Sequence, residues 1–123
     1  MDATSDRRIL QAIDVMEQRL SDRLTVAALS AMVNLSPSRF AHVFRRTTGV
    51  SPVRYLHDMR MRRAQQLLKE TSLPVREVMR QVGWSDPSHF SKAFRRRFGV
   101  GPRGYRDEGD PAIDRRDCSR AMK

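Results

Sequence analysis

The sequence has 123 residues, enough for one compact domain with a core that needs no disulfide or metal. Its 24 Lys and Arg residues exceed its 14 Asp and Glu residues, which gives a net charge of +10. This charge favours a polyanionic partner over an acidic small molecule. Composition alone fits a solvated basic surface equally well. The single cysteine, Cys118, rules out a disulfide within the chain, and neither a signal peptide nor an apolar run of about 18 residues occurs, so we expect a chain of the reducing cytoplasm with no membrane partner.

The first fifty residues predict three helices. Apolar residues at steps of four and three predict an amphipathic helix over 6–20, whose buried face holds Ile9, Ile13, Met16 and Leu20. Thr25 is placed to cap a second, short helix through its hydroxyl oxygen, and a turn follows that helix. Ser36-Pro37 predicts the N-cap and first residue of a third helix, which ends at Gly49.

The rest of the chain predicts four more helices. A second Ser-Pro pair, at 51–52, opens the longest helix, which runs to about Glu70. Its predicted buried side chains are Leu56, Met59, Ala64, Leu67 and Leu68. Further helices are predicted over 75–82, over 86–99 and as a last turn over 102–106, and the tail 107–123 is expected to be disordered. Because no segment alternates as a half-buried strand would, the predicted fold class is all-α with seven helices.

One sequence unit occurs twice. At an offset of 50, residues 36–55 match residues 86–105 at ten of twenty positions, more than shared helix composition gives. Upstream the offset falls to 49, so the second copy holds one extra residue, Asp86. We therefore predict two structural units of one kind.

Each copy has the layout of a helix-turn-helix: a short helix, a tight turn and a second helix with two Phe anchors. Burial of the Phe residues leaves the opposite face of the second helix exposed and narrow enough to enter a major groove about 12 Å wide. A connecting helix of about 18 residues spans roughly 27 Å, so it can hold two such helices about one DNA turn, roughly 34 Å, apart. The predicted organisation is a first subdomain over 6–50, a linker helix over 51–70 and a second subdomain over 71–106, with no need for a dimer.

Three segments resemble the DNA-binding domain of the AraC/XylS family of transcription regulators. They are GWSDPSHF at 83–90, FRRRFGV at 94–100, and the pattern of the long helix from Tyr55-Leu56 to Leu67-Leu68. The similarity covers nearly all residues from Ile9 to Arg106. It implies sequence-specific binding to double-stranded DNA, transcription regulation, RNA polymerase as a further partner, and neither an enzymatic activity nor a cofactor.

In that family the second helix of each unit enters the major groove, and this resemblance implies two sets of base-reading residues. The first set is Ser38, Arg39, Ala41, His42 and Arg45, and the second is Pro87, Ser88, His89 and Lys92. Helical geometry independently puts both sets on the side opposite the Phe anchors. Arg39 and Lys92 are the best candidates for guanine contacts, because their donors suit the O6 and N7 acceptors.

A third set is expected to hold the DNA backbone, since most contacts in such complexes go to phosphate. Its members are Thr25, Arg45, Arg46, Arg95 and Arg96. Trp84 is expected in the core. Arg60 and Arg63 are expected to support the long helix or its packing, with contact to DNA as the alternative.

Parts of the sequence also fit three other interpretations. His42 and His89 could form a metal pair, but no carboxylate or cysteine completes a ligand set. Cys118 could be a nucleophile, as in alkyl-transfer repair proteins that carry a similar domain, but no base lies near it in sequence. Two helical hairpins could serve protein contact alone, which predicts no salt-dependent affinity for duplex DNA.

The sequence differs from the family's usual pattern at three positions, and it is shorter than a typical family member. Ser30 and Met79 stand where the family usually has alanine, and Ala41 lacks a longer polar side chain, which favours contact with a thymine methyl there. Family members usually add an effector-binding or dimerising domain, for which 123 residues leave no room. We therefore expect either a minimal regulator or a fragment of a larger one, nearest to regulators with an amidase-like N-terminal domain. The domain itself is expected to be monomeric, with dimers only through such an added domain.

Overall fold

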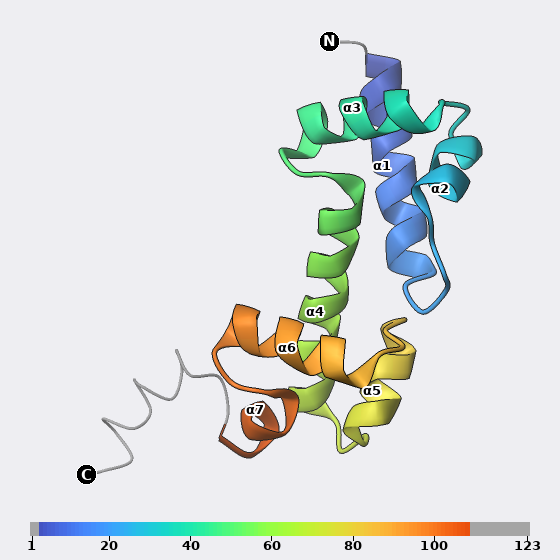
Figure 1. Ribbon diagram of the computed structural model, residues 1–123. Coiled ribbons are helices and arrows are strands. Elements are labelled where there is room, and N and C mark those ends of the chain that lie inside the picture. Colours follow the sequence, from blue (N-terminus) through green and yellow to red (C-terminus); the bar gives the residue numbers. More distant parts are fainter. Residues whose placement is uncertain (1–2, 109–123) are drawn as a thin grey trace. The chain divides into compact units, whose positions relative to one another are not determined.

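The computed structural model describes residues 3–108, which form seven α-helices and no strand (Figure 1). The helices are α1 (Ala3–Gln18), α2 (Val26–Met32), α3 (Pro37–Thr48), α4 (Pro52–Glu70), α5 (Val75–Gln81), α6 (Pro87–Phe98) and α7 (Pro102–Glu108). The predicted all-α fold is confirmed. Helix α7 continues two residues past the predicted end at Arg106, and the rest of the predicted tail, with Cys118, lies outside the described residues.

Contacts divide the chain into two compact units, Met1–Arg60 and Met61–Lys123, and each takes about half of α4. The first unit contains α1, α2, α3 and the start of α4. The second contains the end of α4 followed by α5, α6 and α7. The sequence repeat pairs α1, the first helix of the first unit, with α4, the first helix of the second. It also pairs the start of α4, the last element of the first unit, with α7, the last element of the second.

The core of the first unit is built on the helix faces that the spacing predicted. In Figure 1, α3 lies across α1, and α2 packs against both. Phe40 and Phe44 of α3 are fully buried, with ring centroids 5.6 Å apart, and Tyr55 of α4 meets Phe44 edge-on at 5.3 Å. The other buried apolar residues are Ile9, Ala12, Met16, Leu29, Val33, Val43 and Leu56. Each large side chain stabilises the fold by about 1.5 to 3 kcal/mol through burial.

The core of the second unit repeats this arrangement. Phe90 and Phe94 of α6 are fully buried, and Tyr105 of α7 meets Phe94 edge-on at 5.5 Å, as Tyr55 meets Phe44. The other buried apolar residues are Met61, Ala64, Leu67, Leu68, Val78, Met79, Val82 and Trp84. Trp84 is therefore in the core, as predicted. Met61 is also in this core, although the sequence did not predict it to be buried. Met59, which the sequence predicted to be buried, is only partly buried and packs in the first unit.

Predicted helix caps form in both units. Thr25 accepts a hydrogen bond from the Ala28 N–H at 3.0 Å, and Ser36 accepts one from the Arg39 N–H at 3.1 Å. Gly49 and Gly99 end α3 and α6 with φ of 88° and 87°, a left-handed conformation that glycine adopts without a Cβ clash. These local interactions fix the starts of α2 and α3 and the ends of α3 and α6.

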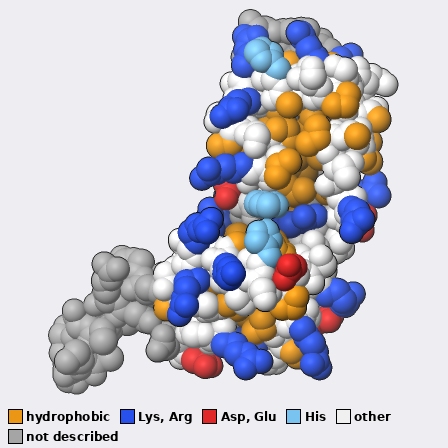
Figure 2. Space-filling view, viewed as in Figure 1, with side chains coloured by type: hydrophobic (Ala, Val, Ile, Leu, Met, Phe, Trp, Pro, Cys, Tyr) orange, Lys and Arg blue, Asp and Glu red, His pale blue; other side chains and the backbone are white. Residues whose placement is uncertain are grey.

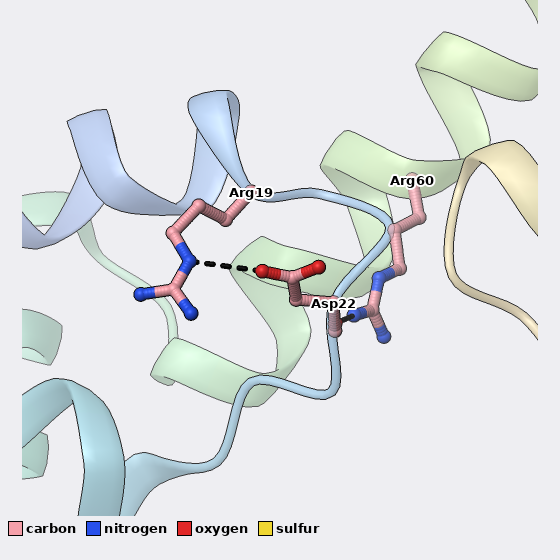
Figure 3. Close-up of polar contacts among 3 residues, drawn as sticks. All are labelled: Arg19, Asp22 and Arg60. Carbon is pink, nitrogen blue, oxygen red and sulfur yellow. Dashed lines mark hydrogen bonds and ion pairs between the residues drawn. The ribbon is translucent and has the colours of Figure 1, made fainter.

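Two arginines tie the ends of helices to the rest of their own units. Arg60 of α4 donates from Nη2 to the Asp22 carbonyl at 2.9 Å, in the turn after α1 (Figure 3). Its Nε donates to the Leu20 carbonyl at 3.3 Å. The Asp22 carboxylate accepts from Arg19 Nε at 2.9 Å in the same turn. Burial lowers the pKa of Arg60 from its ordinary value. The predicted packing role of Arg60 is confirmed.

Arg106 of α7 has a comparable role in the second unit, although the sequence repeat pairs Arg106 with Leu56 and not with Arg60. Its Nε donates to the Leu68 carbonyl at 3.1 Å, its Nη2 to the Thr71 carbonyl at 3.2 Å, and its Nη1 to the Leu73 carbonyl. One side chain thus satisfies three backbone oxygens at and after the end of α4, which an ended helix leaves without helical partners.

Candidate nucleic-acid interface

The second helix of each helix-turn-helix, α3 in the first unit and α6 in the second, is the candidate reading helix. In α3, the buried side holds Phe40, Val43 and Phe44, and this fixes which residues face outward. Of the predicted first-unit residues, the exposed ones are Ser38, Arg39, His42, Arg45 and Arg46. Ala41 is half-buried. The structure therefore brings these residues together on one helix, with Ala41 at the edge of the exposed face.

Helix α6 offers the corresponding face in the second unit. Its buried residues are Phe90 and Phe94. The predicted residues Pro87, Ser88, His89, Lys92, Arg95 and Arg96 are all exposed. His89 occupies the place of Arg39 under the offset of 50, and Lys92 that of His42. The two faces thus share a frame but carry different side chains.

The turn before each reading helix has the same backbone conformation in both units. Asn34 and Gly83, one repeat apart, have positive φ of 58° and 78°. The next residue in each unit donates its backbone N–H across the turn at 2.9 Å: Leu35 to the Ser30 carbonyl and Trp84 to the Met79 carbonyl. The two turns therefore close in the same way although their sequences differ.

The extra residue of the second unit, Asp86, changes the start of α6. Its carboxylate oxygen Oδ1 accepts from the Ser88 N–H at 3.0 Å and the His89 N–H at 3.2 Å, whereas Ser36 accepts one N–H at the start of α3. Asp86 therefore places a negative charge at the end of α6 where the helix dipole is positive. The sequence predicted α6 to start here but not this pair of bonds.

A second contact that sequence reasoning missed joins Trp84 to His89. The indole Nε1 of Trp84 donates to Nδ1 of His89 at 3.2 Å, and the ring centroids are 5.3 Å apart. A buried tryptophan N–H usually finds a partner, so a polar residue five positions after Trp84 was the available signal.

Thr25 and the charged surface complete the candidate interface. Thr25 is exposed at the start of α2, and its oxygen already accepts from the Ala28 N–H, which leaves its O–H as the group that can donate. Figure 2 shows Lys and Arg side chains spread over both units on the face in view, with fewer Asp and Glu. The ion pairs Arg19–Asp22 and Arg80–Glu77 use none of the candidate arginines. Arg80 also holds the pKa of the Glu77 carboxyl below its usual range through their hydrogen bond.

The described residues also bear on metal and membrane binding. Among residues 3–108, no group of three or more His, Cys, Asp or Glu side chains is arranged to hold a metal ion. None of the helices in that range combines the length and apolar character needed to cross a membrane.

Two repeated units, each with a tight left-handed turn and an exposed basic reading helix, define a duplicated helix-turn-helix protein. The sequence matches the protein family described as a helix-turn-helix domain over residues 29–108. The chain belongs to the AraC/XylS family of transcription regulators, as a DNA-binding domain of that family. The part of the protein described by this chain is therefore of the DNA-binding class.

Named relatives agree with this assignment. The arabinose operon regulatory protein of Escherichia coli (strain K12) is 34% identical over 102 residues, which are 82% of this chain and 35% of that protein. The lactose operon transcription activator of Staphylococcus xylosus is 36% identical over 98 residues, 80% of this chain and 35% of that protein. The chain spans about a third of the length of these relatives.

Solved structures share the fold. The DNA-binding domain of AdpA, in complex with a target DNA, superposes with a TM-score of 0.78 at 29% identity, covering 81% of this chain and 90% of that one. The C-terminal domain of AraT, a response regulator from Geobacillus stearothermophilus, gives a TM-score of 0.77 at 30% identity, covering 81% and 84%.

Proposed function

We propose that the chain reads double-stranded DNA with α3 and α6 in neighbouring segments of the major groove, and so directs transcription from specific sites. The observation that carries this is the repeat itself: each unit buries two Phe residues of its reading helix and leaves the opposite, basic face exposed. A helix exposed on one side fits the major groove. The AdpA domain, which has the same fold, was solved in complex with a target DNA, and this supports DNA binding by the fold.

In this proposal the candidate interface residues divide by chemistry. Base reading falls to Ser38, Arg39, Ala41 and His42 on α3, and to Pro87, Ser88, His89 and Lys92 on α6. Backbone phosphates are held by Thr25, Arg45, Arg46, Arg95 and Arg96. Arg39 and Lys92 donate to guanine O6 and N7. The arginines of the last turns lie where a helix favours positive charge, so they can reach flanking phosphates without weakening the helix.

The wider setting follows from the family. We infer that the protein works in the cytoplasm, where DNA is present, and that RNA polymerase is its further partner. Dimers, where they form, depend on a domain other than this one, because each unit already supplies its own reading helix.

Selection of bound sites from random duplexes about 25 base pairs long tests the proposal. Two reading helices predict a site with two conserved segments about one helical turn apart. Arg39→Ala or Lys92→Ala is expected to cost about 1 to 3 kcal/mol and to relax preference at one base pair. Arg95→Ala is expected to weaken binding to all sequences alike and to reduce the salt slope by about 1. A footprint confined to one groove segment, or equal losses on every sequence for Arg39→Ala, would overturn the assignment.

A further inference from the structure

Trp84 holds the side chain of a proposed base-reading residue. It lies in the turn between α5 and α6, where its backbone N–H donates to the Met79 carbonyl at 2.9 Å, and its ring packs edge-on against Phe90 at 5.8 Å. The ring is buried, at 8% exposure, so its position is fixed by the core. From there its indole Nε1 donates to Nδ1 of the exposed His89 at 3.2 Å.

This bond determines where the proton of a neutral His89 ring lies. An indole N–H only donates, so Nδ1 of His89 must offer its lone pair. In the neutral imidazole one nitrogen carries the proton and the other accepts, and therefore the proton is on Nε2. The orientation of the ring is held as well, because the Trp84 ring packs against it in a tilted arrangement, with 41° between the planes.

We propose that Trp84 is a positioning residue for base recognition: it sets His89 as a hydrogen-bond donor, through Nε2–H, toward the base edge that α6 reads. This inference rests on the proposed function. In the major groove an N–H donor is matched by guanine O6 and N7, adenine N7 or thymine O4, and is mismatched by the N4 amino group of cytosine. His89 then selects against cytosine at its position, and its ring enters the groove already oriented, which lowers the ordering cost of binding.

The first unit has no such pair. Leu35 stands in the place of Trp84 and Arg39 in the place of His89, so a flexible cation replaces an oriented ring. The second unit is therefore expected to discriminate at this position through one fixed donor, and the first through the several donors of a guanidinium.

The first arm of the test needs no DNA. Nitrogen NMR of the whole chain, at a pH at which the His89 ring is neutral, is expected to show the ring proton on Nε2, and the Trp84 indole proton signal is expected to move in His89→Ala. Trp84→Phe keeps an aromatic ring but removes the donor, so its His89 ring is expected to show both tautomers in exchange. A His89 ring protonated on Nδ1 in the parent chain, or unchanged by Trp84→Phe, overturns the proposal.

The second arm measures base preference. On a library randomised at each position, Trp84→Phe is expected to lose about tenfold of the preference against cytosine at one base pair, and His89→Ala is expected to lose preference at the same base pair. The double variant is expected to lose no more than His89→Ala alone. His89→Gln, an exposed change that leaves the core intact, presents both a donor and an acceptor and is expected to accept cytosine.

The two arms separate two kinds of failure. If the parent chain shows the Nε2 tautomer but binds no duplex, the proposed function fails and the Trp84–His89 pair remains. If the parent binds specific sites while Trp84→Phe keeps full preference at every base pair, the positioning role fails and the proposed function stands. Thermal unfolding of Trp84→Phe shows whether the variant folds, and the parent tautomer together with His89→Gln decides the question if it does not.

Discussion

The two units share an apolar framework and differ in the polar residues around their reading helices. Phe40, Phe44 and Tyr55 in the first unit correspond to Phe90, Phe94 and Tyr105 in the second, with the Phe–Tyr edge contacts at 5.3 and 5.5 Å. Around this framework, the extra residue Asp86 caps α6 where Ser36 caps α3. Trp84 takes the place of Leu35 in the turn, and His89 takes that of Arg39 on the reading face. The framework fixes the direction of the helix, and the substitutions change what the helix can recognise.

The same contrast is visible under the turn. Ser30 and Met79 occupy equivalent buried positions, 1% and 6% exposed. The Ser30 hydroxyl donates to the Ala27 carbonyl at 3.0 Å, so its burial carries no unsatisfied donor, while Met79 fills the matching space with apolar atoms. A flexible thioether fits irregular gaps. Both departures from the family's alanine are thus accommodated within their own units.

Core truncation gives the largest expected effect and tests whether the frameworks are equivalent. Phe44→Ala and Phe94→Ala each remove a fully buried ring, and each is expected to destabilise its unit by about 3 to 5 kcal/mol. Urea unfolding measures the loss of stability. Trp84 fluorescence reports unfolding of the second unit, and backbone amide NMR signals report unfolding of the first. If the loss of unfolding free energy in one unit were less than half that in the other, the two cores would not contribute equally to stability despite the sequence repeat.

The arginine ties give the next effect. Arg106 donates to three carbonyls and Arg60 to two, so Arg106→Met is expected to cost about 2 to 3 kcal/mol and Arg60→Met about 1 to 2 kcal/mol. Methionine keeps an apolar stem, and the lost hydrogen bonds therefore dominate the change. Arg106→Lys is the matched control, because a single ammonium cannot span three oxygens. Equal costs for the two methionine variants would contradict the ranking.

Sequence alone could predict what depends on neighbouring residues. The caps at Thr25 and Ser36, the glycine ends at Gly49 and Gly99, and the start of α4 all follow from hydrogen bonds within a few positions. The repeat and the exposed face of each reading helix follow from helical spacing. These features place the candidate residues without coordinates.

The features that sequence could not predict depend on distant contacts or on side-chain geometry. Arg60 and Arg106 bind carbonyls 33 to 40 residues away, for which no local pattern exists. Met61 is buried because the inward face of α4 serves the first core at Leu56 and the second from Met61 onward, whereas a single stripe was predicted. The Trp84–His89 bond requires a particular orientation of both rings.

Substitution of the glycines that end α3 and α6 tests whether the two units share the same local helix ends. Gly49→Ala is expected to cost about 1 to 2 kcal/mol, because φ is 88° there and an added Cβ meets no atom within 4 Å, so conformational strain is the whole effect. Gly99, at φ of 87°, is expected to behave alike. Thermal unfolding measures both, and Asn at the same positions is expected to cost less because it tolerates the left-handed region. A stabilised Gly49→Ala chain would contradict the strain argument.

Exchange of the two caps has the smallest expected effect on stability and the most direct bearing on the difference between the units. Ser36→Asp adds a carboxylate at the start of α3, and Asp86→Ser removes one from the start of α6. Both residues cap well, so the free energy of unfolding is expected to change by about 0.3 to 1 kcal/mol.

Affinity for duplex DNA is expected to respond in opposite directions to this exchange. A negative charge at a helix start opposes a nearby phosphate, so Ser36→Asp is expected to weaken binding by about two- to fivefold and Asp86→Ser to strengthen it by a similar factor. Fluorescence anisotropy at two salt concentrations measures both, and the effects are expected to shrink at the higher one because salt screens exposed charges. Ser36→Asn and Asp86→Asn keep a cap without the charge, and they separate charge from helix geometry. If both charge variants weaken binding, or if the asparagine variants change affinity as much as the charge variants do, then the Asp86 carboxylate acts on α6 only as a cap and the two helix starts do not differ in their attraction for phosphate.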